Sequence, residues 1–391
     1  MKVAAGYLNF PEWKEEFKSE IELFSKSLLR SFPILGKENW EPGFFTLDFE
    51  NFSASVKTGI VFDGGSLPEN CQTESIITCD PDLAIRRLKD NKVVKTGFYG
   101  AMGSSFNFFR IFSSEAELEK PAFLWAQNDP ALSFALSLAE TEDKTLQEAL
   151  HEAQWNKLAE AKPTLHIHGF LSVKRLILQA AKLFGILIPQ EQIYVKGIAD
   201  LDLTDLRILK ERGYSVRMVA RADCSESLPK ASVEPCVLSG GSIFSKGKPG
   251  NETLLVKSDC GKESFFCCPG NLNRHKISGI IADLEESERY VGELKFMKEL
   301  KEFQDPFYVS FKMINQRDTF AEAANLFKEH DIGILAFSSE AAFGESEISC
   351  EKRTFLITEK TERKKLEKAL KSLKKKVPLA ETVSVFPLLN L

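Results

Sequence analysis

The stretch from residue 160 to residue 175 concentrates side chains that could do chemistry. It holds Glu160, His166, His168, Lys174 and Arg175. Two imidazoles near a carboxylate are common zinc ligands. Here the two histidines are two residues apart and no third ligand follows in an established pattern. We therefore predict no metal site. The roles of Glu160, Lys174 and Arg175 depend on the longer blocks of sequence described below.

A second candidate is the small-residue turn Gly103-Ser104-Ser105, which follows the predicted strand KVVKTGFYG. A strand that enters a helix through small residues leaves free backbone N–H groups at the helix start, where a ligand can bind. A tight packing turn explains the same residues equally well. Both interpretations stay open.

The cysteines favour reduced thiols in an intracellular protein. Eight are scattered along the chain without a CxxC pair. Cys267 and Cys268 are adjacent, but neighbouring cysteines rarely close a strain-free disulfide, so we expect them to be small buried hydrophobes. The sequence has no GxSxG elbow, P-loop or kinase signature, which excludes those enzyme classes.

Composition indicates a globular protein of two or three domains. The chain has 391 residues, of which 43% are hydrophobic and 27% charged. A formal net charge of -5 gives no global attraction to nucleic acid or to an anionic membrane, so we expect neither as a partner. The start of the sequence lacks the apolar core of a signal peptide, and we predict a soluble cytoplasmic protein.

The elements that must position these residues mix helices and strands. The spacing of apolar residues predicts helices over 13–32, 74–89, 144–160, 169–185 and 203–213, with Gly185 and Gly213 as caps. Strands are predicted at YSVRMVARAD, TLLVKSD and ESFFCCPG, and residues 113–143 are expected to be an irregular, acid-rich insertion. This succession predicts an α/β (α+β) sheet with helices on one face.

The end of the sequence has an order of its own. From Phe307 onward, the order is strand, helix, strand, strand, helix, strand. This βαββαβ succession is the ferredoxin-like arrangement. The lysines Lys374 to Lys376 fall in the last turn of its second helix, where we interpret them as a solvated helix end.

Three blocks of sequence resemble the homoserine dehydrogenases. They are KLAEAKPTLHIHGFLSVKRLILQAAKLFG, KGIADLDLTDLRILKERGYSVRMVARA and CCPGNLNRHKISGIIADL, in the order found in that family. The final βαββαβ unit resembles the ACT domain that many of these enzymes carry. The resemblance implies a remnant N-terminal region over 1–60, a substrate and dimerisation domain over 61–300, and an ACT-like domain over 306–391.

The family reduces aspartate semialdehyde to homoserine with NAD(P), an oxidoreductase step on the route to threonine and methionine. Its first domain is a dinucleotide-binding fold that opens with a strand and a glycine-rich loop. Here Gly6 is the only early glycine, and no GxGxxG follows. Two βαβ halves also need more than about 60 residues. We therefore expect most of the nucleotide domain to be missing, and no cofactor.

The resemblance carries over to the substrate pocket one residue at a time. Glu160 matches the family's first glutamate, whereas Lys162, His166 and His168 replace acidic residues. Leu171 stands for the aspartate that holds the substrate, and an apolar side chain cannot pair with a buried ammonium group. Arg175 stands for the lysine; a guanidinium polarises a carbonyl but does not give up its proton. Lys174 would substitute for it if the helix were rotated.

The glycine turns of the family have changed as well. The turn that frames its active-site cleft corresponds here to 103–107, so that Gly103, Ser104 and Ser105 line the predicted pocket with His168 and Leu171. The later turn near the cofactor is reduced to Pro269-Gly270-Asn271, which leaves Gly270 as the cofactor-side residue. At the effector turn of the terminal domain the resemblance points to Asn315 and Asp318, and Asp318 equally suits a helix cap.

These observations predict a pseudoenzyme: a non-catalytic, binding or regulatory homoserine dehydrogenase relative, with a small amino acid as its ligand. The alternative is an active NADP-dependent homoserine dehydrogenase with a site rebuilt around Glu160 and Lys174 or Arg175. Because the family pairs subunits through the sheet of its middle domain, we also expect a homodimer.

Overall fold

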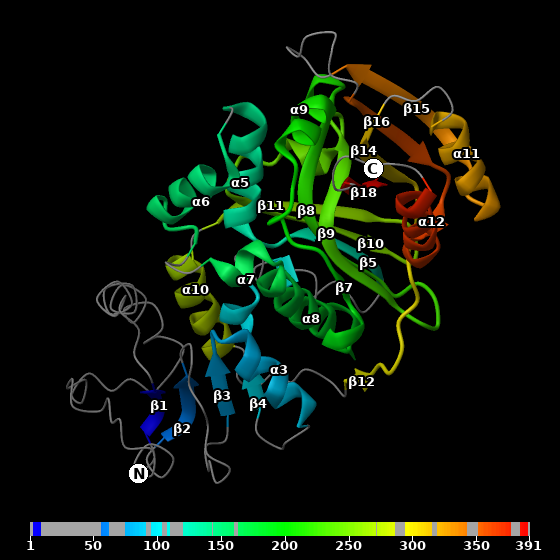
Figure 1. Cartoon of the computed structure of the whole chain (residues 1–391). Helices are drawn as coiled ribbons and strands as arrows, with labels where there is room; N and C mark the ends of the chain where they lie inside the picture. Colours follow the sequence, from blue (N-terminus) through cyan, green and yellow to red (C-terminus); the bar gives the residue numbers. More distant parts are fainter. Residues whose placement is uncertain are drawn as a thin grey trace.

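The computed structural model arranges the chain as three connected parts: a small parallel sheet, a central sheet covered by helices, and a terminal unit that continues the central sheet (Figure 1). The structure describes residues 3–8, 56–61, 75–90, 95–103, 108–109, 120–142, 144–159, 163–270, 272–285, 294–314, 319–341, 351–376 and 384–389. The α/β (α+β) class predicted from the sequence is confirmed. The helix predicted over 13–32 lies outside the described residues.

The N-terminal part is a four-stranded, all-parallel sheet. Its order is β1 (Val3–Leu8), β2 (Val56–Val61), β3 (Ser75–Thr78) and β4 (Lys95–Gly97). The predicted boundary at residue 60 runs through β2. We expected most of a nucleotide domain to be missing because about 60 residues are too few for two βαβ halves. The strands of this sheet, however, come from residues 3 to 97.

The region 74–89 is a strand followed by a helix, which corrects the single helix expected there. α3 (Pro81–Lys89) begins only after Asp80, whose side chain accepts hydrogen bonds from the N–H groups of Asp82 and Leu83. A proline in the first turn has no N–H to leave unsatisfied, so Asp80-Pro81 is a strong helix start. The preceding residues Ser75–Thr78 are fully buried and pair as β3.

The insertion expected over 113–143 is instead ordered from residue 120 onward. β5 (Pro121–Gln127) runs into α5 (Pro130–Thr141), so each of the two prolines begins an element. A proline is tolerated at the first residue of a strand and at the first helical position. The prolines therefore mark starts here, where we had interpreted them as signs of irregular chain.

The central sheet continues through long antiparallel strands. β11 (Glu263–Pro269), β10 (Asn251–Ser258), β5, β8 (Tyr214–Asp223) and β9 (Lys230–Ser239) lie side by side in that order. β9 is a strand that the sequence pattern did not predict, because Pro235 lies in its middle. Pro235 falls between the two stretches of β9 that pair with β7 (Tyr194–Val195) and with β18 (Ser384–Leu389).

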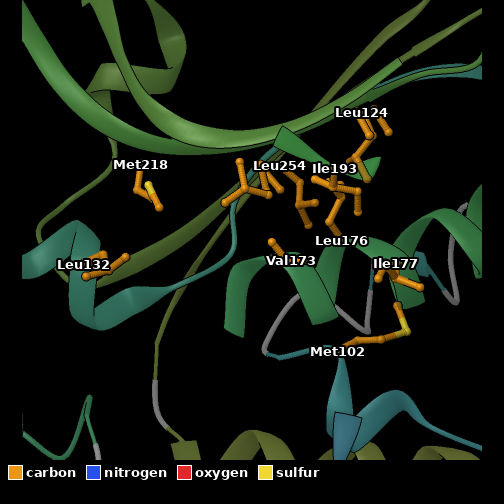
Figure 2. Close-up of a cluster of buried hydrophobic side chains, with 14 of the residues drawn as sticks. Met102, Leu124, Leu132, Val173, Leu176, Ile177, Ile193, Met218 and Leu254 are labelled. Carbon is orange, nitrogen blue, oxygen red and sulfur yellow. The ribbon is translucent and has the colours of Figure 1, made fainter. Parts of the chain in front are cut away.

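Helices cover one face of this sheet. The longest, α8 (Phe170–Phe184), begins after Gly169 and ends at Gly185, both in the left-handed region, as expected for Gly185. Figure 2 shows Val173, Leu176 and Ile177 of α8 facing Leu124, Met218 and Leu254 of the strands, with Met102 on the other side of the helix. The remaining elements on and around this face are α6 (Leu146–Trp155), α7 (Thr164–Ile167), β6 (Ile186–Leu187), η3 (Gln190–Gln192), α9 (Leu203–Glu211) and β12 (Lys295–Phe296). The helix α10 (Leu272–Glu285) and the turn η2 (Tyr99–Ala101) pack against each other and against β3 of the N-terminal sheet.

The opposite face of the central sheet has a smaller core. Trp125, Val219, Leu238 and Leu255 pack there with Phe244 of η4 (Ile243–Lys246). The Gln127 side chain donates to the Phe244 carbonyl at 2.8 Å, which holds η4 against the sheet. β8 and β9 are therefore buried on both faces.

The terminal part has the predicted βαββαβ order. Its elements are β14 (Phe307–Ile314), α11 (Thr319–Glu329), β15 (Ile334–Ala341), β16 (Glu351–Thr358), α12 (Arg363–Lys376) and β18, with β13 (Gln304–Asp305) and β17 (Thr361–Glu362) as a short extra pair. The strands lie antiparallel in the order β18-β14-β16-β15. The ferredoxin-like arrangement is thus confirmed.

The terminal part is fixed to the central sheet through both backbone and side chains. β18 pairs in parallel with β9, so the strands of both parts belong to one ten-stranded sheet (Figure 1). Nearby, the buried Asp205 of α9 accepts from Tyr308 and Ser310 of β14 at 3.1 and 2.6 Å. Arg353 of β16 donates to the same carboxylate at 2.9 Å, which closes an interdomain cluster.

Within the described part of the chain, every helix is too short or too polar to cross a membrane.

Candidate functional site

The turn between β5 and α5 is the centre of the candidate site. Asn128 and Asp129 are both buried there. The Asp129 side chain caps α5, accepting from the N–H groups of Ala131 and Leu132 at 3.1 and 3.3 Å. This turn points toward α7 and α8, so it meets the histidine and arginine singled out from the sequence.

His166 is held by Asp129. Its Nδ1 lies 2.9 and 2.8 Å from the two carboxylate oxygens, and both side chains are almost fully buried. Burial opposes ionisation of Asp129, but the His166 imidazole and the nearby Arg175 lower the pKa of this carboxyl below its ordinary value. Asp129 is therefore ionised near neutral pH and fixes the orientation of the imidazole.

Arg175 of α8 completes the cluster from the other side. Its guanidinium donates to the Asn128 carbonyl and lies 3.3 Å from Glu252 Oε1 of β10. The Asn128 side chain in turn donates to the Ser172 carbonyl at 3.1 Å and to Gln179 at 3.3 Å, which ties the turn to α8. We call Asn128, Asp129, His166, Arg175 and Glu252 the central cluster.

Two of the glycines predicted for the site pack against this cluster. Gly103 has a φ of +92°, and a Cβ there would lie 2.7 Å from Glu252 Oε1. At Gly270 a Cβ would lie 2.2 Å from Pro130 Cβ, directly beside Asp129, and 2.6 Å from the Gly250 carbonyl. Both turns therefore need glycine for close packing.

Lys174 points away from the central cluster. Its ammonium group lies 2.7 Å from Asp82 of α3, so it joins α8 to the N-terminal part. Arg175, and not Lys174, thus belongs to the central cluster. Among the other predicted pocket residues, Leu171 is half-buried on α8, and His168 is exposed with its ring 6.1 Å from that of Phe170.

The remaining candidate residues, Glu160, Ser104, Ser105, Asn315 and Asp318, lie outside the described residues. Their predicted roles stay predictions.

Sequence reasoning missed Asn128, Asp129 and Glu252. The signal at Asp129 was available, because an Asp-Pro pair after an apolar run is a typical helix start. Glu252 gave no local signal. It lies 77 residues from Arg175 along the chain and reaches it only because β10 pairs with β5.

The cysteines do not add a nucleophile to the central cluster. Burial raises the pKa of the Cys224 thiol to about 12, and burial also raises that of Cys236. The expectation that Cys267 and Cys268 are both buried is wrong: Cys267 is exposed, because β11 is an edge strand whose alternate residues face outward. Among the described residues no three His, Cys, Asp or Glu side chains gather as a metal site would require.

The N-terminal sheet is parallel, as in a nucleotide-binding fold, but its described strands follow one another in chain order without the reversal at which such folds bind a cofactor, and its glycine does not fit a phosphate turn. Such a glycine must follow the end of the first strand. Gly6 lies inside β1, paired with Gly59 of β2, two residues before the strand ends. We therefore derive no chemical step through a nicotinamide cofactor.

Comparisons with known proteins agree with this geometry. The family model described as homoserine dehydrogenase matches residues 130–284. A homoserine dehydrogenase of Helicobacter pylori is 22% identical over 211 residues, 52% of this chain and 50% of that protein. One of Bacillus subtilis is 24% identical over 213 residues, with 51% and 49% covered. The chain thus spans about half the length of the curated relatives that it matches.

Solved structures extend the similarity of fold over the whole chain. The crystal structure of a homoserine dehydrogenase from Thiobacillus denitrificans has a TM-score of 0.83 with 17% identity, covering 100% of this chain and 99% of that one. At this identity the likeness is one of fold. The part of the chain that is similar in sequence to the homoserine dehydrogenases thus includes residues 130–284, which contribute three of the five residues of the central cluster.

Proposed function

We propose that this protein is a non-catalytic relative of homoserine dehydrogenase that serves aspartate-family amino-acid metabolism as a binding or regulatory protein. The chemistry of the family requires a group near the reacting carbonyl that can exchange a proton, and carboxylates that hold the substrate ammonium. The proposal rests on what the central cluster offers at those two places.

The observation that carries the proposal is the state of Arg175. Its guanidinium is buried and donates to the Asn128 carbonyl while it pairs with Glu252. An arginine keeps its proton throughout the physiological pH range, so it cannot act as the acid of a carbonyl reduction.

Leu171 supports the same conclusion. It precedes Arg175 by four residues on α8, so the two side chains share one face of the helix. The aspartate expected at this position would hold the substrate's ammonium group. A leucine leaves that group without a partner, which costs about 1–3 kcal/mol or more for a buried charged group.

The test is oxidation of L-homoserine by the purified full chain. We expect no NADP reduction at 340 nm above the rate without enzyme, while an active homoserine dehydrogenase measured in parallel gives a clear signal. Leu171→Asp is the informative variant: it should raise the affinity for L-homoserine by calorimetry, because it restores an acidic partner one turn before Arg175. Homoserine-dependent NADP reduction by the unchanged chain would overturn the proposal.

The second candidate function is an active NADP-dependent homoserine dehydrogenase. One observation favours it: β1 to β4 form a parallel sheet with α3 between β3 and β4, which is the βαβ unit of nucleotide-binding folds. Titration with NADPH separates the candidates. An enhancement of nicotinamide fluorescence, together with turnover, supports the active enzyme.

Three further expectations belong to the proposal. The chain acts as a homodimer, which a monomeric mass in light scattering at micromolar concentration would contradict. It works in the cytoplasm. Its terminal unit takes an amino acid, and a thermal-shift screen with threonine, methionine, lysine and isoleucine tests this expectation.

A further inference from the structure

A groove lies where the terminal part meets the central sheet. Two adjoining cavities of about 590 and 560 Å³ open there, and they share Arg221, Lys301, Glu302, Phe303 and Asp305. Each is within the size range of small-molecule sites, which are common at domain boundaries. We call the two cavities together the junction groove. Its walls include η3, β7 and β9 of the central part and the start of α12 of the terminal part.

The junction groove is acidic. Its lining has an excess of three negative charges, from eight carboxylates and five cationic side chains. The carboxylates belong to Glu191, Asp223, Glu226, Glu234, Glu302, Asp305, Glu362 and Glu367, and the cations to Arg221, Lys230, Lys301, Arg363 and Lys364. Low-dielectric walls focus such an excess, so the groove attracts cations.

The cations of the groove are already paired. Arg221 contacts Asp305 at 3.1 Å, and Arg363 pairs with Glu234. The lysines pair with Glu226, Asp223 and Glu302, the closest of these contacts being Lys364 with Glu302 at 2.5 Å.

Among the described residues, three of the eight carboxylates have no ion pair: Glu362 at the smaller cavity, and one from each part of the protein at the larger cavity. In the portion of the chain that the structure describes, Glu191 of η3 and Glu367 of α12 form no ion pair, although both line the larger cavity. Their charges are the ones that a ligand could neutralise.

Aromatic rings in the groove already accept organic cations. The Arg363 guanidinium lies 4.3 Å from the Tyr194 ring centre and 4.8 Å from that of Phe307. The Arg221 guanidinium lies 4.0 Å from the ring centre of Phe303. These ring faces stabilise the positive charge of the protein's own arginines and hold them beside their carboxylates, so the attraction for a ligand comes from the unpaired carboxylates.

We propose that the junction groove binds a small organic cation with a primary amine, of the class of the basic amino acids, between Glu191 and Glu367. This inference rests on the proposed binding function and names the ligand class of that function at a site separate from the central cluster. Because the two carboxylates come from different parts of the chain, the bound cation links the terminal part to the central sheet.

Calorimetric titration of the full chain tests the proposal with three probes. L-lysine and cadaverine both carry an amine at the end of an aliphatic chain, whereas L-norleucine has the same chain length as L-lysine but no side-chain amine. We expect L-lysine and cadaverine to bind and L-norleucine to give no heat of binding. Equal binding of L-norleucine, or no binding of L-lysine and cadaverine, overturns the proposal.

Variants locate the site. Glu191→Gln with Glu367→Gln should weaken L-lysine binding at least tenfold, because both unpaired charges of the larger cavity are removed. The matched control is Glu211→Gln with Glu322→Gln, two exposed carboxylates outside the groove, which should leave the affinity unchanged. Unchanged affinity in the groove variant contradicts the assignment.

The outcome is separable from that of the proposed function. A chain that oxidises homoserine and also binds L-lysine in the groove would reject the non-catalytic proposal and keep this one. A chain that is inert toward homoserine and ignores L-lysine would do the reverse.

Discussion

The central cluster and the junction groove both contain buried arginines paired with carboxylates, but they differ in what is left over. In the central cluster Arg175 meets Glu252, and His166 meets Asp129, so each charged group has a partner within the cluster. In the junction groove the pairing of the described residues leaves three carboxylates without a cation, those of Glu191, Glu362 and Glu367. The difference teaches that the residues identified by resemblance are already paired, whereas the surplus charge lies at the junction groove, where we proposed a ligand.

The two regions also differ in how they are held. The central cluster lies within one part of the chain, at the start of α5, on α7 and α8, and on β10. The junction depends on contacts between two parts, among them the cluster of Asp205, Tyr308, Ser310 and Arg353. The junction should therefore respond most strongly to loss of a single charge.

The largest expected effect is that of Asp205→Ala. This carboxylate is fully buried, and its loss leaves Arg353 with only the partly exposed Asp202 as a partner. Removing one member of a buried ion pair costs about 3–5 kcal/mol of unfolding free energy. Urea denaturation measures it, with Glu211→Ala on the same helix as the control. A loss below about 1 kcal/mol would mean that the contacts of Asp205 do not stabilise the attachment of the terminal part to the central sheet.

Asp129→Asn should have the next largest effect and should depend on pH. The pKa of Asp129 is lower in the folded protein than in the unfolded chain, so its stabilisation is complete above about pH 4–5 and disappears as pH falls through the folded value. At pH 7 the variant should lose about 1.5–3 kcal/mol, as for other hydrogen bonds to charged groups.

The same pair of proteins, unfolded in urea at pH 7 and pH 3.5, checks the sign. The difference between them should shrink at the lower pH. If the difference in unfolding free energy is the same at both pH values, the carboxylate charge of Asp129 does not stabilise the central cluster. The central cluster could then not be described as a set of stabilising charge pairs.

Gly270→Ala tests whether this turn packs against the central cluster. The added methyl group would overlap Pro130 and the Gly250 carbonyl, so the backbone must move. Overpacking of this kind costs about 1–3 kcal/mol. Gly241→Ala is the matched control, since nothing lies within 4 Å of a Cβ there. Equal melting temperatures for the two variants would contradict the packing role.

The smallest effect is expected for Lys174→Ala. Its partner Asp82 is 56% exposed, and solvent screens such a pair. Exposed pairs of this kind contribute about 0.2–1 kcal/mol. A double-mutant cycle with Asp82→Ala isolates the coupling. A coupling free energy above about 2 kcal/mol between Lys174 and Asp82 would contradict this expectation, because it would equal that of a buried ion pair.

Much of the fold follows from local sequence signals. Gly185 ends α8 as predicted, β8 has the predicted bounds Tyr214–Asp223, and the terminal βαββαβ order is as expected. Two of the failures share one cause, the interpretation of proline. Pro121 and Pro130 were taken to interrupt structure, whereas each begins an element, and Pro235 hid a central strand.

The site was less predictable than the fold. Arg175 could be found because it belongs to a continuous block of sequence, and Gly103 and Gly270 could be found as glycines in turns. The contacts of these three residues could not be predicted, because Glu252 and Pro130 approach them only through tertiary packing. Sequence pattern identifies which residues are unusual, but the pairing of charges requires the folded sheet.

The pairing of β9 with β18 has a consequence for how the protein is made. On the ribosome, β9 emerges long before Ser384–Leu389, so one edge of the central sheet must wait for the last strand of the terminal part. An open strand edge in a nascent chain is a template for pairing with other chains. Emergence of β18, and not of any earlier element, should therefore be the step that protects this edge from aggregation.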